Sequence, residues 1–505
     1  MKKPIIALVG IVILIVLVIL LINSFSAITA GLTHILQLVF DPNVNVDPST
    51  IVVCSENSTC SVVWPVVFTL ILIFVVLTGF AYTTLFERRI IAFLQQRVGP
   101  NRIGPGGFLQ PLADGIKLIF KEDITPSEVI KPIYYLAPVL KAVPIILLFA
   151  VLPFGPKILI PWFDGLWYSV PLYIADLNVS ILWVIAISSL ATYGIVLAGW
   201  SSNNKYSMLG SLRSSAQLIS YELSMGLALA VPVIIAGSMS LIDIVEAQKT
   251  IFDWFILENP IAAGILFVAI FAETSRAPFD LPEAEQELTQ GYTTEYSGMK
   301  FALFMMAEYM GMIAMSILFA STYLGGYHLF GVSANPLLGP VYMFIKILLF
   351  LFLFIWVRAT LPRIRYDRLM SFGWKFLLPL SLVAVAWTAV ATVIGTGLPN
   401  TPLYAVISGL FFVVVVAAGY LILRSESETV EVEGESIDIS KDPIVTGERT
   451  GLGWILVQAV GALFAVIFAI VQWHIRLFRG LASMGSPASK AIEVSENKPA
   501  ETGGD

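Results

Sequence analysis

The chain has 505 residues, of which 57% are hydrophobic and 13% are charged, and its mean hydropathy is +0.85. Water-soluble domains of this length rarely carry so few charges, so lipid is the expected solvent for most of the chain. The formal net charge of −6 gives no support for a nucleic-acid partner. The sequence lacks CxxC, HExxH and Walker-type spacings, so we expect no metal, flavin or iron-sulfur cluster on this chain.

Apolar stretches recur along the chain at the length of about 20 residues that a membrane-spanning helix needs. They predict an all-α, polytopic integral membrane protein with about 10 or 11 transmembrane helices. Ten stretches are 5–22, 63–85, 133–153, 178–199, 216–237, 260–275, 301–323, 340–361, 375–395 and 403–423. An eleventh, 452–473, is followed by two arginines and can alternatively lie along the membrane interface.

Loop cations orient these helices, because cytoplasmic loops of membrane proteins are enriched in Lys and Arg. Nearly all of the loop cations fall in four connections, which are therefore predicted to be cytoplasmic: 86–132, 200–215, 274–300 and 362–374. The stretch 5–22 could open a cleaved signal peptide, but no small-residue cleavage site closes it. We therefore expect a retained span and a cytoplasmic N-terminus.

This orientation places the segment 24–62 on the outer side of the membrane. The segment contains the only two cysteines, Cys54 and Cys60. In an oxidising compartment the two can form a disulfide, although a pair of free thiols fits the sequence as well.

The connection 86–132 is rich in turn-forming residues, and its stretch Leu112–Phe120 predicts a short amphipathic helix carrying Asp114 and Lys117. The GxxxxGK[ST] spacing of a phosphate loop is missing. The arginines in this connection also fit an alternative without a ligand site, in which they bind anionic lipid and so hold a loop at the membrane surface.

Three carboxylates interrupt or end apolar stretches: Glu222, Glu273 and Glu308. A charged side chain near the bilayer centre costs at least ~2.5–3.5 kcal/mol on insertion scales, so each is a functional candidate unless something pairs it. The alternative for Glu222 and Glu308 is a structural pairing with Lys346, Arg358 or a backbone group.

Between the last two of these acids, Glu283, Glu285 and Glu287 are spaced by two residues. An extended backbone would place all three on one side, where mutual repulsion raises carboxyl pKa values toward neutrality and favours proton transfer. The alternative is a solvated loop whose acids face water. Pro278 and Pro282 argue against a continuous helix through this loop.

Three long stretches carry a family resemblance: ERRIIAFLQQRVGPNRIGPGGFLQPLADGIKLIFKED, LGSLRSSAQLISYELSMGLAL and ETSRAPFDLPEAEQELTQGYTTEYSGMKFALFMMAEY. In this order they resemble the signature regions of the H subunit of NADH-quinone oxidoreductase, the bacterial counterpart of the mitochondrially encoded first ND subunit. The resemblance covers about 64–424. It implies a helical subunit at the junction of the hydrophilic and membrane arms of respiratory complex I, in the bacterial cytoplasmic (inner) membrane.

The resemblance also implies ligands and partners. Quinone is the expected substrate, and the expected partners are cluster-bearing subunits of the peripheral arm, antiporter-like membrane subunits and the lipid bilayer. Carried over by position, the residues of the quinone cavity are Glu87, Arg88, Asp114, Lys117, Arg276, Phe279 and Asp280. The acids that would link quinone reduction to proton translocation are Glu222, Glu273, Glu283, Glu285, Glu287 and Glu308.

The ends of the chain depart from the family pattern, whose first span usually ends at the Glu87 motif. We therefore expect an extra N-terminal helix and outer segment at 1–62, a membrane core like that of the H subunits at 63–424, and an acidic linker, apolar helix and polar tail at 425–505.

Three other functions fit parts of the sequence. Buried acids also occur in proton-coupled secondary transporters, but the two halves of the chain show no internal repeat. The matching subunit of a membrane-bound hydrogenase or ferredoxin-linked dehydrogenase is a closer rival, against which the intact LPEAEQEL and TEY motifs favour the quinone-linked form. A purely structural anchor for a peripheral enzyme would not need the buried acids.

Overall fold

The computed structural model describes residues 51–54, 57–161, 167–280, 288–332, 335–395 and 414, and this part of the chain is mostly helical. It contains seven helices long and apolar enough to cross a membrane: Thr59–Leu94, Lys131–Leu148, Ser180–Ser201, Lys205–Ala236, Gly298–Tyr323, Leu338–Thr360 and Tyr366–Val393. Together with the shorter apolar helix Pro260–Glu273, they match eight predicted stretches and confirm the all-α, polytopic class. The predicted spans 5–22 and 452–473, and 403–423 apart from Val414, lie outside the described residues.

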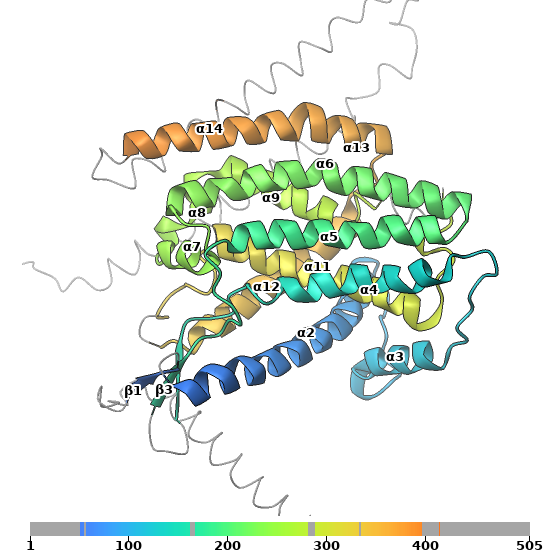
Figure 1. Ribbon diagram of the computed structural model, residues 1–505, viewed down its shortest axis with the longest axis horizontal. Coiled ribbons are helices and arrows are strands. Elements are labelled where there is room, and N and C mark those ends of the chain that lie inside the picture. The colour runs from blue at the N-terminus through green and yellow to red at the C-terminus, as the bar shows by residue number, and fades with distance from the viewer. Residues whose placement is uncertain are drawn as a thin grey trace, which may run out of the picture. The chain divides into compact units, whose positions relative to one another are not determined.

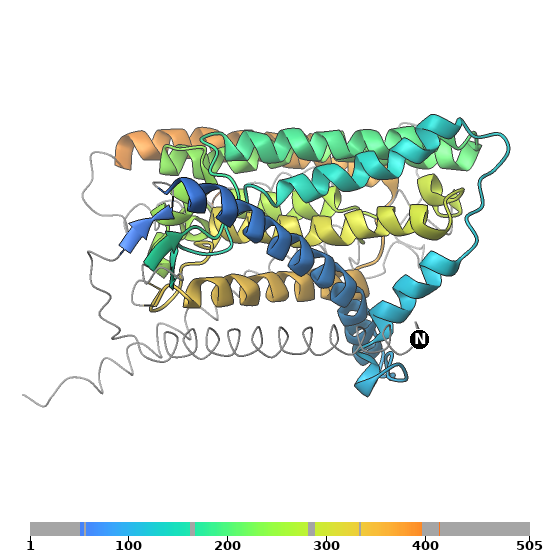
Figure 2. The ribbon, with the colours of Figure 1, turned by 60° about the horizontal axis from the view of Figure 1, so that its bottom comes forward.

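In chain order the helices are α2 (Ser58–Leu94), α3 (Gln110–Phe120), α4 (Lys131–Leu148), α5 (Ser180–Ser201), α6 (Lys205–Ala236), α7 (Leu241–Ala247), α8 (Phe255–Glu258), α9 (Pro260–Glu273), α11 (Gly298–Tyr323), α12 (Leu338–Thr360), α13 (Tyr366–Phe372) and α14 (Leu378–Gly395). Helices α4, α5 and α6 lie side by side in this order, and α14 packs on α6 (Figure 1). Helix α11 packs against α4, whereas α2 crosses the bundle obliquely and leads to the separate helix α3 (Figure 2).

Asparagine side chains begin three of the apolar helices. Asn57 accepts hydrogen bonds from the backbone N–H groups of Thr59 and Cys60 at the start of α2. Asn204 and Asn259 do the same at α6 and α9, each at 3.0 Å. These bonds satisfy N–H groups that have no partner within the helix, which matters most in an apolar surrounding.

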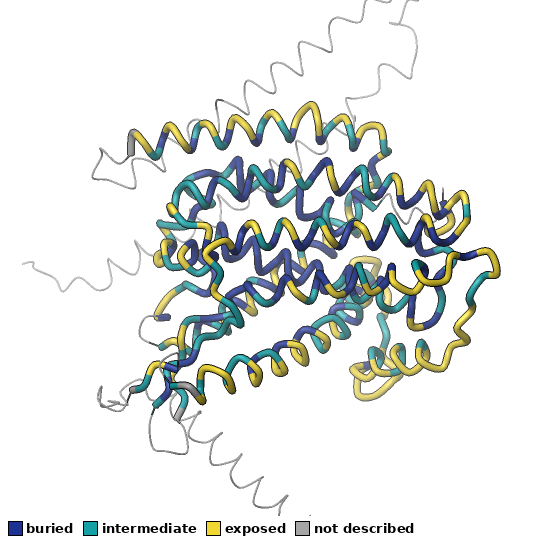
Figure 3. The backbone as a smooth tube through the Cα atoms, in the orientation of Figure 1, coloured by how far each residue is buried: buried dark blue, intermediate teal, exposed yellow. Residues whose placement is uncertain are grey.

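Burial is uneven around the bundle. Helices α5, α6 and α11 are largely covered by their neighbours, whereas α2, α3 and α14 carry many exposed residues (Figure 3). Many of the exposed side chains on α2 are large and apolar, such as Leu70 and Phe74. Exposed apolar side chains on a spanning helix fit contact with lipid or with another membrane subunit.

A small sheet at the start of α2 was not predicted. Its strands are β1 (Ile51–Val53), β2 (Ile158–Pro161) and β3 (Trp167–Val170), in the order β1-β3-β2. Strand β1 is parallel to β3, and β2 is antiparallel to it. The structure joins Cys54 and Cys60 in a disulfide, with a Cα–Cα distance of 5.2 Å, and so ties the end of this sheet to the first turn of α2.

Candidate functional site

A buried arginine joins two carboxylates from distant parts of the chain. Arg276 follows the end of α9, and its guanidinium lies 3.7 Å from Glu87 of α2 and 3.8 Å from Glu308 of α11. All three side chains are at most 10% exposed. The guanidinium also lies over the ring of Tyr309, 4.3 Å from its centroid. Such a shared cation offsets part of the cost of burying both acids.

Further contacts complete this pairing. Arg358 of α12 also forms an ion pair with Glu87. The phenol of Tyr292 donates a 2.9 Å hydrogen bond to Glu308. Glu87 and Glu308 therefore each have both a charged partner and a hydrogen-bond donor, the arrangement that buried charges need.

The loop that carries Arg276 is held by a side-chain amide from α6. The Nε2 atom of Gln217 donates hydrogen bonds to the carbonyl oxygens of Ala272 and Phe279, at 3.0 and 2.9 Å. Phe279 is buried and packs on Tyr221, with ring centroids 5.6 Å apart. These contacts fix the turn between the two carbonyls and place Arg276 and Asp280 on the rigid bundle.

Asp280, at the end of this described turn, has one carboxylate oxygen without a hydrogen-bond partner among the described residues. This atom, Oδ1, is buried. Burial and the charge of Glu308 raise the pKa of Asp280 above its ordinary value, against the opposing effect of nearby arginines. A carboxyl group of this kind can exchange a proton at less acidic pH than a solvated aspartate.

Behind Glu308 lies a small cavity between α4, α5, α9 and α11, with both polar and apolar side chains in its lining. Its volume is about 30 Å³, and its lining includes Glu308, Glu273, Lys141 and Ser188. A cavity needs roughly 10–15 Å³ to hold one water molecule, so this space suits one or two waters and not a quinone ring. The cavity places polar side chains and room for water between Glu308 and Glu273.

Glu222 of α6 extends this series of acids. Its carboxylate accepts a hydrogen bond from Ser189 of α5, which neighbours Ser188 in the lining of the cavity. The charge of Glu222 also acts on Glu273. The described acids therefore form a file through the bundle, in the order Glu87, Glu308, Glu273 and Glu222, with Arg276 between the first two.

The other predicted quinone residues form a separate, more exposed group. Arg88 lies 2.6 Å from Asp114 of α3, and Lys117 lies 3.4 Å from the same carboxylate. Partial burial raises the pKa of Asp114, but the hydrogen bond and charge of Arg88, together with Lys117, lower it below its usual range. Although Arg88 is next to Glu87 in the sequence, the structure does not bring this group into the buried file.

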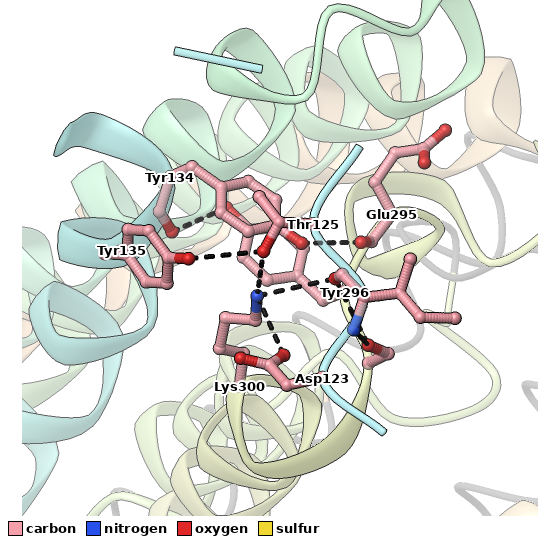
Figure 4. Close-up of polar contacts among 9 residues, drawn as sticks. Asp123, Thr125, Tyr134, Tyr135, Glu295, Tyr296 and Lys300 are labelled. Atoms are coloured by element: carbon pink, nitrogen blue, oxygen red, sulfur yellow. Dashed lines mark hydrogen bonds and ion pairs between the residues drawn. The ribbon is translucent and has the colours of Figure 1, made fainter. Parts of the chain in front are cut away.

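An aromatic and ionic cluster fixes the start of α11 to α4 (Figure 4). The ammonium of Lys300 lies 2.8 Å from Asp123 and over the rings of Tyr134 and Tyr135. Pro138 has no N–H to bond the carbonyl of Tyr134, four residues earlier, and this oxygen instead accepts a 3.2 Å hydrogen bond from Tyr296. The cluster holds the TEY motif beside the site.

The partners named in the structural alternative for Glu222 and Glu308 are not the ones that the structure shows. Lys346 donates to the carbonyls of Leu324, Gly326 and His328, near the end of α11, and Arg358 pairs with Glu87. Glu222 and Glu308 bind Ser189, Tyr292 and Arg276 instead. The spacing of charges along the sequence could not show which helices are neighbours.

Lys141 and Tyr292 are among the site residues that the sequence did not predict. Lys141 interrupts the apolar stretch 133–153 in the same way as the acids do, and this was the available signal. Tyr292 has no comparable sequence signal. The predicted residues Glu283, Glu285 and Glu287 lie outside the described residues, so their role stays a prediction. Among the described residues, no group of three or more His, Cys, Asp or Glu side chains could hold a metal ion.

Comparisons with known proteins agree on one family. Residues 67–389 match the family model described as NADH dehydrogenase. The chain is 52% identical over 319 residues to an H subunit of NADH-quinone oxidoreductase from Geobacter sulfurreducens, and the match covers 63% of this chain and 93% of that protein. It is 50% identical over 332 residues to the H subunit from Leptospira biflexa, with 64% and 93% covered. It is 48% identical over 358 residues to subunit 8 of NADH-quinone oxidoreductase from Thermus thermophilus, with 70% and 93% covered.

Proposed function

The chain belongs to the NADH dehydrogenase family, as an H subunit of NADH-quinone oxidoreductase, and we propose that it forms a wall of the quinone cavity and couples quinone reduction to proton translocation. It is thus a multi-pass membrane subunit of an enzyme complex. The observation that carries the coupling proposal is the position of Arg276 between Glu87 and Glu308.

The quinone would be reduced on the side of Arg276, Asp280 and Glu87, with Arg88, Asp114 and Lys117 near its path into the cavity. Converting a quinone to a quinol takes two electrons and two protons, and the electrons come from another subunit. Asp280 supports this placement because its raised pKa suits a group that gives and regains a proton. Arg276 supplies a fixed positive charge beside the negative charge that builds up during reduction.

The coupling would be electrostatic. New negative charge at the quinone competes with Glu87 and Glu308 for the shared cation Arg276, and interactions between charges are strong in a low-dielectric interior. When the attraction between Arg276 and Glu308 weakens, Glu308 takes up a proton more readily from water in the cavity. Glu273 and Glu222 then pass the change on toward the antiporter-like subunits, and the group titrates as a unit.

The test is to replace Glu222 and Glu308 separately by glutamine in the complete complex. We expect assembled complexes that translocate at least tenfold fewer protons per unit time, since positioned proton donors contribute about 10²–10⁴-fold. Proton uptake into vesicles and quinone reduction are measured together. Glu128→Gln, which changes an exposed loop acid, is the matched control. Unaltered coupled translocation in the Glu222→Gln variant would overturn the proposal.

The surroundings of the chain are part of the proposal. We place it in the bacterial cytoplasmic membrane, with a cytoplasmic N-terminus and with cluster-bearing and antiporter-like subunits as neighbours. The matched residues 67–389 fall within the proposed core at 63–424, and we propose that the additions 1–62 and 425–505 contact extra subunits.

Purification through a tag on this chain, followed by mass spectrometry and an NADH-quinone assay, tests this assembly. Recovery of both kinds of subunit with inhibitor-sensitive activity is the expected result. Antiporter-like partners without an NADH-oxidising module would show that another reductant supplies the electrons.

A further inference from the structure

Lys141 is a buried cation in the middle of a spanning helix. It lies on α4, and only 7% of its surface is exposed. A lysine at this depth costs at least ~2.5–3.5 kcal/mol on insertion scales, so its retention calls for a compensating interaction. Among the described residues, however, its ammonium has no carboxylate within 4.0 Å and is therefore not half of a direct ion pair.

The groups that face Lys141 are across the cavity. Glu273 of α9 and Glu308 of α11 line the same space, and both act on the charge of the lysine. Helix α5 contributes only Ser188 and Ala191 to the lining. The Oε2 atom of Glu273 is buried and has no hydrogen-bond partner among the described residues, so it has an open position toward water or a proton.

Close helix packing fixes the position of the lysine. Helices α4 and α5 touch at Gly194, where an added Cβ atom would lie 2.6 Å from the backbone nitrogen of Lys141 and 2.9 Å from its Cα. No side chain larger than hydrogen fits between the two backbones at this point. The backbone of Lys141 is thereby held against α5 beside the cavity.

We infer that Lys141 is a positioning residue that, through water in the cavity, keeps one carboxylate of the pair Glu273 and Glu308 ionised and so sets the rate of proton transfer between them. This inference rests on the proposed function of the two acids. One proton moves from one carboxyl to a bridging water while that water gives a proton to the other carboxylate, so the ammonium itself neither gains nor loses a proton. The positive charge of Lys141 stabilises whichever carboxylate is ionised.

The test compares Lys141→Met, Lys141→Gln and Lys141→Arg in the complete complex. We expect proton translocation to slow about tenfold in the Met and Gln variants, because an opposite charge nearby changes a carboxyl equilibrium by about one pH unit or more. Their pH profile of proton translocation should move to higher pH by about one unit, since more acid is protonated without the cation. Arginine should restore most of the rate and the original profile. Lys131→Met, which removes an exposed cation from the same helix, is the control.

The outcomes separate this inference from the proposed function. Normal translocation in the Glu222→Gln and Glu308→Gln variants would remove the coupling role on which both rest. Impaired glutamate variants together with wild-type rates and pH profiles in the Met and Gln variants would overturn the lysine inference alone. If the Met variant does not assemble on native gels, the Gln and Arg variants decide: equal rates and profiles in the two would show that the charge is not needed.

Discussion

The phenol of Tyr292 donates a 2.9 Å hydrogen bond to the carboxylate of Glu308, although 16 residues and the start of α11 separate them. A hydrogen bond to a charged group contributes about 1.5–3 kcal/mol, so Tyr292→Phe should reduce coupled proton translocation by about tenfold. Proton uptake and quinone reduction in vesicles measure the effect. Tyr342→Phe removes a hydroxyl that donates to a backbone carbonyl at the other end of the bundle and is the control. Equal effects of the two variants would contradict a role for Tyr292.

Asp280→Asn should have opposite effects on stability and on activity. Burial and Glu308 raise the pKa of Asp280, so its neutral form fits the fold better, and wild-type stability falls as pH rises from the ordinary value of 3.8 through the raised value. Asparagine cannot ionise, and the melting temperature of the variant relative to wild type should therefore increase with pH over this range. Quinone reduction should fall at least tenfold if the carboxyl transfers a proton.

Melting curves and quinone assays at several pH values test both effects. Asp367→Asn, on the exposed first turn of α13, should change neither. A melting temperature of the Asp280→Asn variant that falls relative to wild type as pH rises would show that the fold favours the ionised form of Asp280.

Water in the cavity can be detected through a new thiol at Ser188. The native cysteines are bonded to each other, so Ser188→Cys introduces a single free thiol into the described part of the chain. Brief exposure of native membranes to Ag⁺, an ion close to water in size, should protect this thiol from later alkylation after denaturation. Ser201→Cys, on the same helix but fully buried outside the cavity, should stay unprotected. Equal alkylation of both thiols would indicate a dry cavity.

The predicted orientation can be tested at the disulfide. A membrane-impermeant reductant and maleimide should label Cys54 and Cys60 from the outer side of intact cells and not in inverted vesicles. A thiol introduced by Ser127→Cys, in the exposed connection after α3, should show the opposite pattern. Labelling of the native pair only in inverted vesicles would show that the predicted orientation of the whole bundle is the wrong way round.

The sequence predicted the apolar helices well, because a helix buried in lipid requires a long run of apolar residues. Such a run can be recognised without knowing which helices are its neighbours. It placed their ends less well. Helix α2 continues to Leu94, beyond the predicted end at 85, and α6 begins at Lys205 instead of 216. In both cases the helix continues through polar residues beyond its apolar run, and a search for apolar residues cannot detect this extension. The short sheet escaped prediction because its strands have only three or four residues.

The candidate site was predicted as a list of residues and not as an arrangement. Family resemblance selected Glu87, Arg276 and Glu308, but their meeting depends on how α2, α9 and α11 pack, which no local pattern encodes. Lys141 was missed because a single cation in an apolar run does not by itself show that two acids from other helices face it. Partners of intramembrane charges come from other helices, so their identity requires the fold.

The length of α2 has a consequence for the membrane itself. Its 37 residues extend about 55 Å at 1.5 Å per residue, well beyond the ~30 Å hydrocarbon core of a bilayer. The polar residues after position 85 account for part of this excess, and a tilt of the helix accommodates the rest, so the depth of Glu87, about 44 Å along the helix, depends on that tilt. A thicker bilayer would favour a more upright helix and so change the depth of Glu87 in the membrane. Acyl-chain length thus becomes a variable of turnover, one that reconstitution in lipids of graded length would reveal.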